Sequence, residues 1–358
     1  MGIMKDLRLR LSQNLGLLLA IGLFVLLYGL YSSLHPRGGS VDLLVQNSNE
    51  TFTLIMVSIA QTLPVLTGGL DLSVGPLMTL VNCLASWLIS GSPAQMVLGV
   101  LACLAAGLAG GLVNGCIVVY GRIQPIIATL ATGAVFIGIA LLLRPTPGGT
   151  VDQDLSWVTT NAMAEMFTTY GWFPDGVPDW LANSFGLVPM PILLLVLVVL
   201  LVWVPFRNSV TGRGCYAIGS SEAAAYMSGV PIARSKLAAY AVGGLFAGIG
   251  GLYLAIQTGS GNADIPQAGA YTLNSIAAVV IGGTSLFGGS GGAVGSIFGA
   301  LVLRSISFCF RVFDADSAVG FLANPLLQPL FEGLILLVAV SLGAARVFRV
   351  KNRLNLFG

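Results

Sequence analysis

The chain alternates long apolar runs with short polar intervals, and this pattern predicts a bundle of membrane-spanning helices. A run of about 20 apolar residues has the length that an α-helix needs to cross a bilayer. The fold class expected is an all-α polytopic membrane protein, one transmembrane domain over residues 1–358. We expect about ten spans, roughly at 15–31, 51–69, 72–90, 95–120, 125–143, 189–206, 237–257, 272–288, 293–311 and 326–345.

Composition supports this assignment. Hydrophobic residues make up 56% of the chain and charged residues only 8%, whereas a soluble domain carries about 25% charged residues. The five cysteines lack CxxC spacing and four of them lie in apolar runs, so we expect small core residues and no disulfide or metal framework. The single histidine, His35, is expected in a loop between spans.

The distribution of charge predicts an orientation. The ten-span arrangement places all but four of the 16 Lys and Arg residues on the side of the two termini. The interval 145–188 carries five acidic residues and no Lys or Arg. Because basic loops stay in the cytoplasm, we expect cytoplasmic termini, a basic cytoplasmic tail at 346–358 and a periplasmic loop at 145–188. The aromatic residues of that loop leave two interpretations open, interfacial helices or a docking surface for an extracytoplasmic partner.

The interval 207–236 is predicted to be a cytoplasmic loop that contacts another protein. Glu222–Met227 contains good helix formers behind Ser220 and Ser221, which can cap the first turn. Gly229, with Pro231 beyond it, is expected to end this helix. Small residues along the loop would let a partner approach the backbone closely. The residues expected at this contact are Gly212, Arg213, Ala217, Gly219, Glu222, Ala223, Ala224, Ser228 and Gly229.

Two Gly-Gly sequences interrupt apolar runs and predict helix breaks inside the membrane, TGGLDLSVGP at 67–76 and IGGTSLFGG at 281–289. They share glycines and a leucine at a constant offset of 214 (282 − 68), which suggests weakly duplicated halves. Non-helical backbone at this depth must be satisfied by protein or by water. A tight turn to which Asp71 hydrogen-bonds and a cavity lining therefore both remain open. The residues considered for a pathway or gating role are Gly68, Gly69, Asp71, Ser73, Asn82, Asn274, Gly282 and Gly283.

Three further expectations concern polar residues in the spans. Ser73 is expected to cap the helix after the first break, because Pro76 then occupies its third position, where the N–H is unpaired anyway. Asp71 is then a lone carboxylate near the turn. Arg304 and Glu332 lie about 10 and 12 Å in from the outer side, and we hypothesise that they pair. Snorkelling of Arg304 alone is the alternative.

Nothing in the sequence indicates catalysis. It has no Walker A motif, no His-based triad and no cluster with metal-ligand spacing. The chain itself is therefore not expected to be an enzyme. The glycine-rich stretches 107–111 and 243–251 have no preceding strand, so they predict close helix packing and not a nucleotide loop.

Three segments together carry a family resemblance: LTGGLDLSVG at 66–75, TGRGCYAIGSSEAAAYMSGV at 211–230 and LNSIAAVVIGGTSLFGGSGGAVGSIFGALVL at 273–303. With them the chain resembles, over most of its length, the permeases of bacterial ABC importers for ribose, xylose and galactofuranose. Asn274, Arg304 and Glu332 depart from the family pattern, which leaves the sugar and the details of the pathway open.

The resemblance implies a type II-importer-like fold in the bacterial inner membrane and import of a monosaccharide from periplasm to cytoplasm by alternating access. It also implies partners: ABC ATPase subunits that use ATP and Mg²⁺, a second permease copy or a sister permease, and a periplasmic sugar-binding protein. Neither a cofactor bound by this chain nor a nucleic acid is implied. By that likeness, 222–229 forms the helix that sits in a groove of the ATPase. An ion-coupled secondary transporter remains the alternative, since it too would show glycine breaks and duplicated halves.

Overall fold

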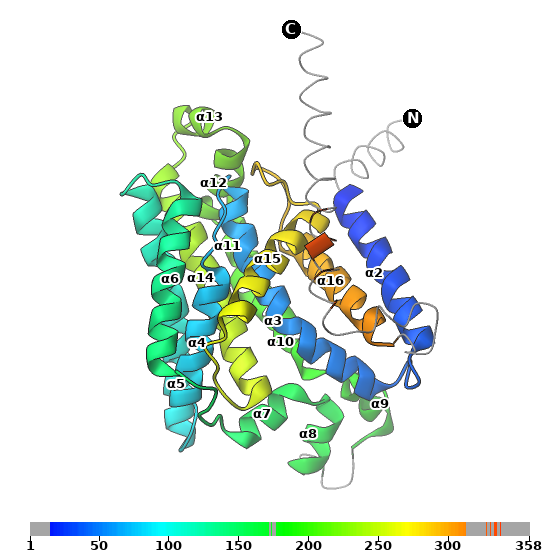
Figure 1. Ribbon diagram of the computed structural model, residues 1–358. Coiled ribbons are helices and arrows are strands. Elements are labelled where there is room, and N and C mark those ends of the chain that lie inside the picture. The colour runs from blue at the N-terminus through cyan, green and yellow to red at the C-terminus, as the bar shows by residue number, and fades with distance from the viewer. Residues whose placement is uncertain are drawn as a thin grey trace, which may run out of the picture.

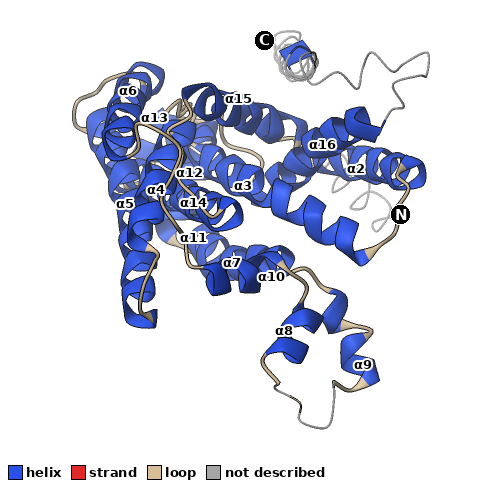
Figure 2. Cartoon of the chain, turned by 60° about the horizontal axis from the view of Figure 1, so that its bottom comes forward, coloured by secondary structure: helices blue, strands red, loops and turns tan. Residues whose placement is uncertain are grey.

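The computed structural model describes residues 15–171, 173 and 177–312, together with 327, 330, 333, 334 and 337. Within this part helices are the regular secondary structure and loops connect them (Figures 1 and 2), with two isolated β-bridges, Gly148 with Gly261 and Ala162 with Pro189. The elements are α2 (Leu15–Leu34), α3 (Val41–Leu66), α4 (Val74–Leu88), α5 (Pro93–Val119), α6 (Pro125–Leu143), α7 (Gln153–Thr160), α8 (Met163–Thr169), α9 (Asp179–Ala182), a short 3₁₀ turn (Phe185–Leu187), α10 (Met190–Val198), a π-helical turn (Val199–Trp203), α11 (Val204–Asn208), α12 (Val210–Ser220), α13 (Glu222–Met227), α14 (Ile232–Thr258), α15 (Ile265–Ile281) and α16 (Ala293–Val312).

Six helical segments among the described residues are long and apolar enough to cross a membrane: α2, α5, α6, the continuous segment Met190–Asn208, α14 and α16. Helices α4 and α15 are apolar but shorter, and α3 is long but polar in its first turns. The tenth predicted span, 326–345, lies mostly outside the described residues. The structure therefore confirms an all-helical, multi-span protein, whereas the count of ten spans is not confirmed.

Helices α3 and α15 begin earlier than hydropathy predicts, because each starts at a capping residue. Helix α3 begins at Val41, and not at residue 51 as predicted, because the Ser40 side chain accepts a hydrogen bond from Leu43 N (3.2 Å). Helix α15 begins after Asp264, whose side chain accepts from Gln267 N (3.0 Å), and not at residue 272 as predicted. It ends at Ile281, before the Gly-Gly sequence.

Helix α14 lies at the centre of the bundle and packs against α5, α3 and α4. Its crossing with α5 is a contact between backbones. A methyl group added to Gly107 would lie 2.6 Å from Gly244 O, and one added to Gly111 would lie 2.8 Å from Gly244 Cα. Small residues permit such an approach between membrane helices, so the two predicted packing seams are confirmed.

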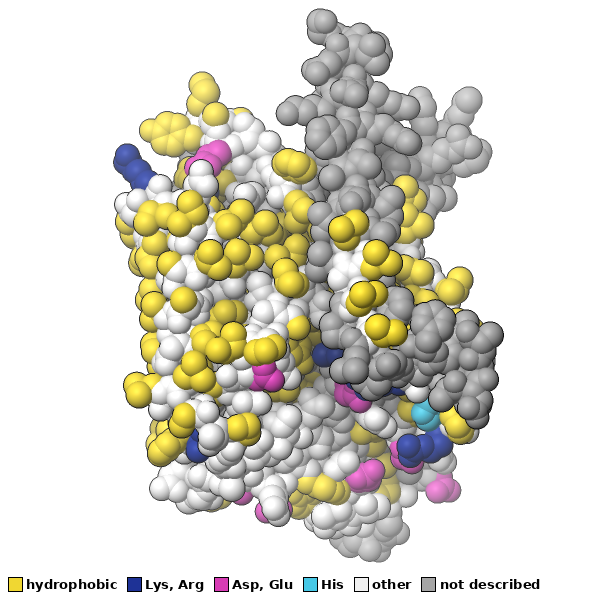
Figure 3. Space-filling model, viewed as in Figure 1, with side chains coloured by type: hydrophobic (Ala, Val, Ile, Leu, Met, Phe, Trp, Pro, Cys, Tyr) yellow, Lys and Arg dark blue, Asp and Glu magenta, His cyan; other side chains and the backbone are white. Residues whose placement is uncertain are grey.

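The remaining helices surround this centre. Helix α16 packs against α2, α15 and α3, and Figure 2 shows α2 and α16 on one side of the molecule and α4, α5 and α6 on the other. Helices α7, α8 and α9 lie at one end, which we call the α7 end, and α13 lies at the opposite end, the α13 end (Figure 1). Hydrophobic side chains cover much of the middle of the face in Figure 3, and exposed leucines such as Leu98, Leu130 and Leu201 suit contact with lipid.

Candidate functional site

Helix α13 is a short exposed helix at the α13 end. The Ser221 side chain accepts a hydrogen bond from Ala224 N (3.3 Å), which confirms the predicted cap. The helix ends where predicted, because Gly229 adopts a φ of 75°, a conformation that glycine reaches without strain. Most of its side chains point away from the protein, and the exposed fractions of Tyr226 and Met227 are 75% and 88%.

Helix α12, directly before α13, was not predicted. The Ser209 side chain caps it by accepting from Gly212 N (3.0 Å). The sequence analysis expected its small residues to admit a partner, but methyl groups at Gly212 and Gly219 would overlap backbone atoms of this same chain. These two glycines therefore serve internal packing. Arg213 is exposed and Ala217 is partly buried.

The first break joins α3 to α4. Ser73 precedes the first residue of α4 and Pro76 is the third, as predicted, but the Ser73 side chain makes no cap. It binds Asp71 instead: Ser73 N and Ser73 Oγ both donate to Asp71 Oδ1, at 2.8 and 2.6 Å. Asp71 is buried, and its carboxylate hydrogen-bonds the turn, as the tight-turn interpretation implies. The difference from the prediction is the role of Ser73, whose hydroxyl donates to Asp71 and does not cap α4.

Buried amides and hydroxyls extend this cluster across neighbouring helices. Asn114 Nδ2 of α5 donates to Ser73 Oγ (2.7 Å), and Thr132 Oγ1 of α6 donates to Asn114 Oδ1 (2.6 Å). With its amide oriented to suit its neighbours, Gln61 of α3 donates to Asp71 O (2.7 Å) and accepts from Asp71 N (3.2 Å). Gln61 and Asn114 therefore hold the turn around Asp71.

Two threonines complete the hydrogen bonding of the break. Leu72 N donates to Thr129 Oγ1 of α6 (2.9 Å), and Gly75 N donates to Thr272 Oγ1 of α15 (3.1 Å). Protein side chains thus satisfy backbone groups that the helices leave unpaired, as buried backbone requires. This geometry favours a tight turn, and a gating role for these residues stays a prediction.

The second break, after α15, repeats the ending of α3. Gly283 has a φ of 85° and Gly68 a φ of 80°. Gly283 N donates to Val280 O (3.0 Å), just as Gly68 N donates to Val65 O (2.9 Å). The matching positions are offset by 215 (283 − 68), one more than the sequence alignment gave, and the duplication of the two halves is not confirmed.

The two breaks meet each other and the end of α12. Gly289 N donates to Leu66 O (3.1 Å), which links the loop after α15 to the end of α3. A methyl group at Gly288 would lie 2.8 Å from Gly219 Cα and 2.9 Å from Gly68 N. We call Gly68, Gly219, Gly288 and Gly289 the glycine junction. No spacing in the sequence indicated it, since its members come from three distant segments.

Two other predicted pathway residues, Asn82 and Asn274, lie outside the glycine junction. Asn82 Oδ1 of α4 accepts from Asn262 N (2.8 Å) and so holds the α14–α15 loop at the α7 end. Thr62 of α3 and Ser296 of α16 share a hydrogen bond between their hydroxyl oxygens (2.6 Å). Asn274 lies on α15 and is partly buried. These contacts join helices to each other, which is the common role of polar residues in membrane proteins.

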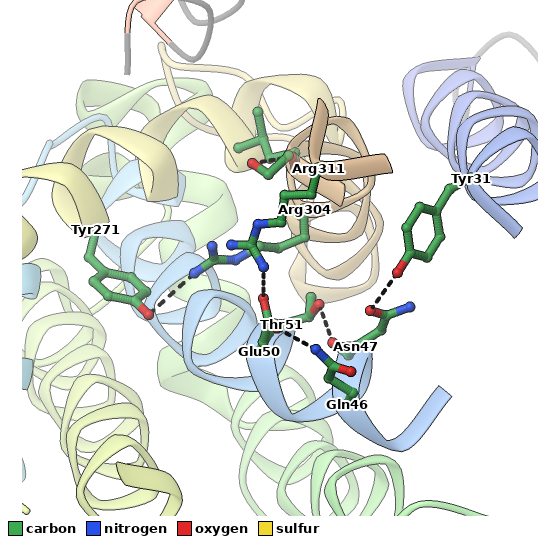
Figure 4. Close-up of polar contacts among 10 residues, drawn as sticks. Tyr31, Gln46, Asn47, Glu50, Thr51, Tyr271, Arg304 and Arg311 are labelled. Atoms are coloured by element: carbon green, nitrogen blue, oxygen red, sulfur yellow. Dashed lines mark hydrogen bonds and ion pairs between the residues drawn. The ribbon is translucent and has the colours of Figure 1, made fainter. Parts of the chain in front are cut away.

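Two arginines extend from α16 toward neighbouring helices (Figure 4). Arg304 Nη2 donates to Tyr271 Oη (3.3 Å), and its guanidinium lies 5.8 Å from the centre of that ring. Glu332, its hypothesised partner, lies outside the described residues. The sequence analysis missed an ion pair in the last turn of this helix, between Arg311 Nη1 and Glu50 Oε2 of α3 (2.7 Å).

Comparison with known proteins places the chain in a family. Residues 43–340 match the family described as "Branched-chain amino acid transport system / permease component". The ribose import permease RbsC of Escherichia coli K12 is 36% identical over 284 residues, which cover 79% of this chain and 82% of that protein. RbsC of Bacillus subtilis 168 is 32% identical over 289 residues, 80% of each chain.

A more distant relative is the autoinducer 2 import system permease LsrD of Escherichia coli O9:H4, 26% identical over 296 residues, 83% of each chain. No solved structure matched the chain. The match to the family covers most of the chain, and it includes both Gly-Gly breaks and the α12–α13 segment. The chain therefore belongs to this family of ABC transporter permeases, as the three sequence segments predicted.

Proposed function

We propose that this chain is the transmembrane subunit of an ATP-driven importer that moves a monosaccharide from periplasm to cytoplasm by alternating access. Membership of the permease family supports the importer. The family description names branched-chain amino acids, so the choice of a sugar rests on the ribose import permeases at 36% and 32% identity. Ribose, xylose and galactofuranose are the candidate substrates.

The observation that carries this proposal is the exposed helix α13. Its outer surface combines small side chains, Ala223 and Ala224, with the exposed Tyr226 and Met227. Aromatic residues and methionine are enriched at protein interfaces, and an exposed helix of this kind suits insertion into a groove. We propose that α13 docks on an ABC ATPase, with contacts from Glu222, Ala223, Ala224, Ser228 and Gly229, and from Arg213 nearby.

The distribution of charge supports an orientation for this docking. At the α13 end, Arg122 lies in a loop, Arg207 in the last turn of α11 and Arg234 in the first turn of α14. We propose that this end is cytoplasmic, with both termini on the same side. The α7 end carries Asp152 and Glu165 and would face the periplasm, where a sugar-binding protein docks. This arrangement corresponds to the bacterial inner membrane.

In this proposal the chain has no catalytic site of its own, and partner ATPases bind and hydrolyse ATP with Mg²⁺. A second permease copy or a sister permease completes the pathway. Closure of the two ATPases would displace α13, and the helices would switch as rigid bodies between outward-open and inward-open states. Loop 207–236 is the coupling segment within the single permease domain.

Affinity purification tests the docking. The tagged chain is purified in mild detergent from cells that also express its proposed ABC ATPase, and retained ATPase is measured for wild type, Ala224→Arg and Ala94→Arg. Ala94 is another exposed alanine, at the α7 end on α5. We expect wild type and Ala94→Arg to retain the ATPase and Ala224→Arg to lose it. Equal retention by all three would move the contact away from α13, and no retention by wild type would contradict the importer.

A further inference from the structure

Helix α13 is joined to the bundle without a flexible linker. Ser221 is the residue after α12 and the N-cap of α13, and its backbone N–H still donates to Ala217 O (3.1 Å). A second connection lies on the other side, where Lys236 Nζ of α14 contacts Glu222 Oε1 (2.8 Å). Because no loop separates the two helices, a displacement of α13 must also move the last turn of α12.

That last turn contacts the rest of the protein through backbone atoms. A methyl group at Gly219 would overlap Leu66 O and Gly289 N and would lie 2.9 Å from Gly288 C. Contacts between side chains can absorb a small displacement by a change of rotamer. A contact between backbones in a close-packed interior has no such freedom. The glycine junction is therefore a stiff contact between α12 and both helix breaks.

Tyr216 makes a second contact with the same loop, one turn earlier on α12. Its hydroxyl donates to Gly291 O (3.1 Å). Burial raises the pKa of Tyr216 above its ordinary value, so the phenol keeps its proton and remains a donor at physiological pH. The loop between α15 and α16 thus contacts α12 at two residues, Gly219 and Tyr216.

The junction acts on several helices at once. Leu66 is the last residue of α3; the first break follows it, with Asp71 five residues further on and α4 beginning at Val74. Gly289 lies in the loop that leads directly into α16. A displacement of α12 at the junction would therefore reach α3, α4 and α16 together.

We propose that Gly219 and Tyr216 transmit the displacement of α13 to the two helix breaks, and that they are coupling residues of the transport cycle which do not themselves form the docking surface. This inference rests on the proposed docking of an ATPase on α13. Changes on α13 should prevent binding of the ATPase. Changes at the glycine junction should leave the complex assembled but uncouple ATP hydrolysis from transport.

The test uses the complete complex, permease with its ATPase subunits and binding protein, in proteoliposomes. Retained ATPase, ATP hydrolysis and uptake of labelled ribose, xylose or galactose are measured for wild type, Gly219→Ala, Tyr216→Phe and Gly269→Ala. Gly269 is the matched control, a helical glycine on α15 whose added methyl group would have no neighbour within 4 Å. Tyr216→Phe keeps the ring and removes only the hydrogen bond to the loop.

We expect Gly219→Ala to retain the ATPase and to hydrolyse ATP within about twofold of wild type, while sugar uptake falls about tenfold, a usual size for a coupling effect. Tyr216→Phe should lower uptake in the same direction, and Gly269→Ala should resemble wild type. Normal uptake by Gly219→Ala and Tyr216→Phe would overturn the inference but leave the importer intact. Loss of the ATPase from Gly219→Ala would also overturn it, because the junction would then position the docking surface. Absence of the ATPase from wild type would refute the proposed function itself.

Discussion

The carboxylate of Asp71 accepts two buried hydrogen bonds, and its replacement tests how the first break is held. Asp71→Ala removes the acceptor from Ser73 N and Ser73 Oγ, which lie 2.8 and 2.6 Å from Asp71 Oδ1. A buried donor left without a partner costs about 1–3 kcal/mol. Because the hydroxyl can turn toward another acceptor, we expect the pair to cost about 2–4 kcal/mol of the free energy of unfolding. Asp71→Asn keeps an oxygen in the same place and should cost less than about 1 kcal/mol.

This difference is measured as the apparent melting temperature in detergent, determined by fluorescence-detected size-exclusion chromatography. We expect Asp71→Ala to melt on the order of 5 °C below wild type, with Asp71→Asn close to wild type and still active in sugar uptake. Two results would refute the reasoning. If Asp71→Asn destabilised the protein as much as Asp71→Ala, the hydrogen bonds to Ser73 would not hold the break. If Asp71→Asn were stable but inactive, the charge itself would serve in gating.

Two further predictions follow from burial. Gly111→Ala places a methyl group 2.8 Å from Gly244 Cα and should destabilise the protein by about 1–3 kcal/mol. The control Gly138→Ala, whose methyl group has no neighbour within 4 Å, should be neutral or stabilising. Equal melting temperatures of the two variants would contradict the packing seam. Burial raises the pKa of the Cys215 thiol to about 12, so in a chain whose other cysteines are alanine its maleimide labelling should stay slow from pH 7 to 9. A cysteine introduced at the exposed Ser228 should label rapidly and faster as pH rises; equal labelling of the two would mean that Cys215 is accessible.

Hydropathy predicts the spans best where a helix is apolar from end to end. Helices α5, α6 and α14 lie within a few residues of their predicted ranges, because lipid requires a continuous apolar surface of fixed length. Hydropathy fails where a polar segment is helical and buried in protein. Asn47 and Asn49 are buried in the first turns of α3, and nothing in their polarity separates them from loop residues.

Local signals predict helix ends at α13 but not the helix before it. Ser221 and Gly229 have the residue types that caps require, and the structure uses both. Helix α12 contains three glycines, which disfavour a helix in isolation. It forms because it packs against α14 and α3, and such tertiary stabilisation leaves no local pattern.

The glycine junction shows the same limit for the candidate site. The sequence pattern indicated that Gly68 and Gly219 belong to segments of functional interest, but it led to the prediction that Gly219 lets a partner protein approach the backbone. A glycine permits close approach from any direction, and only the fold shows that the end of α3 and the loop after α15 occupy this position.

ATP-driven uptake in proteoliposomes tests the central claim most directly. The chain is reconstituted with its ATPase and binding protein, and uptake of labelled ribose, xylose and galactose is measured with ATP, without ATP, and with an imposed proton or sodium gradient. The account predicts uptake of at least one sugar that requires ATP and is lost in Ala224→Arg. Uptake that follows the ion gradient without ATP would contradict it and would assign the chain to ion-coupled transport.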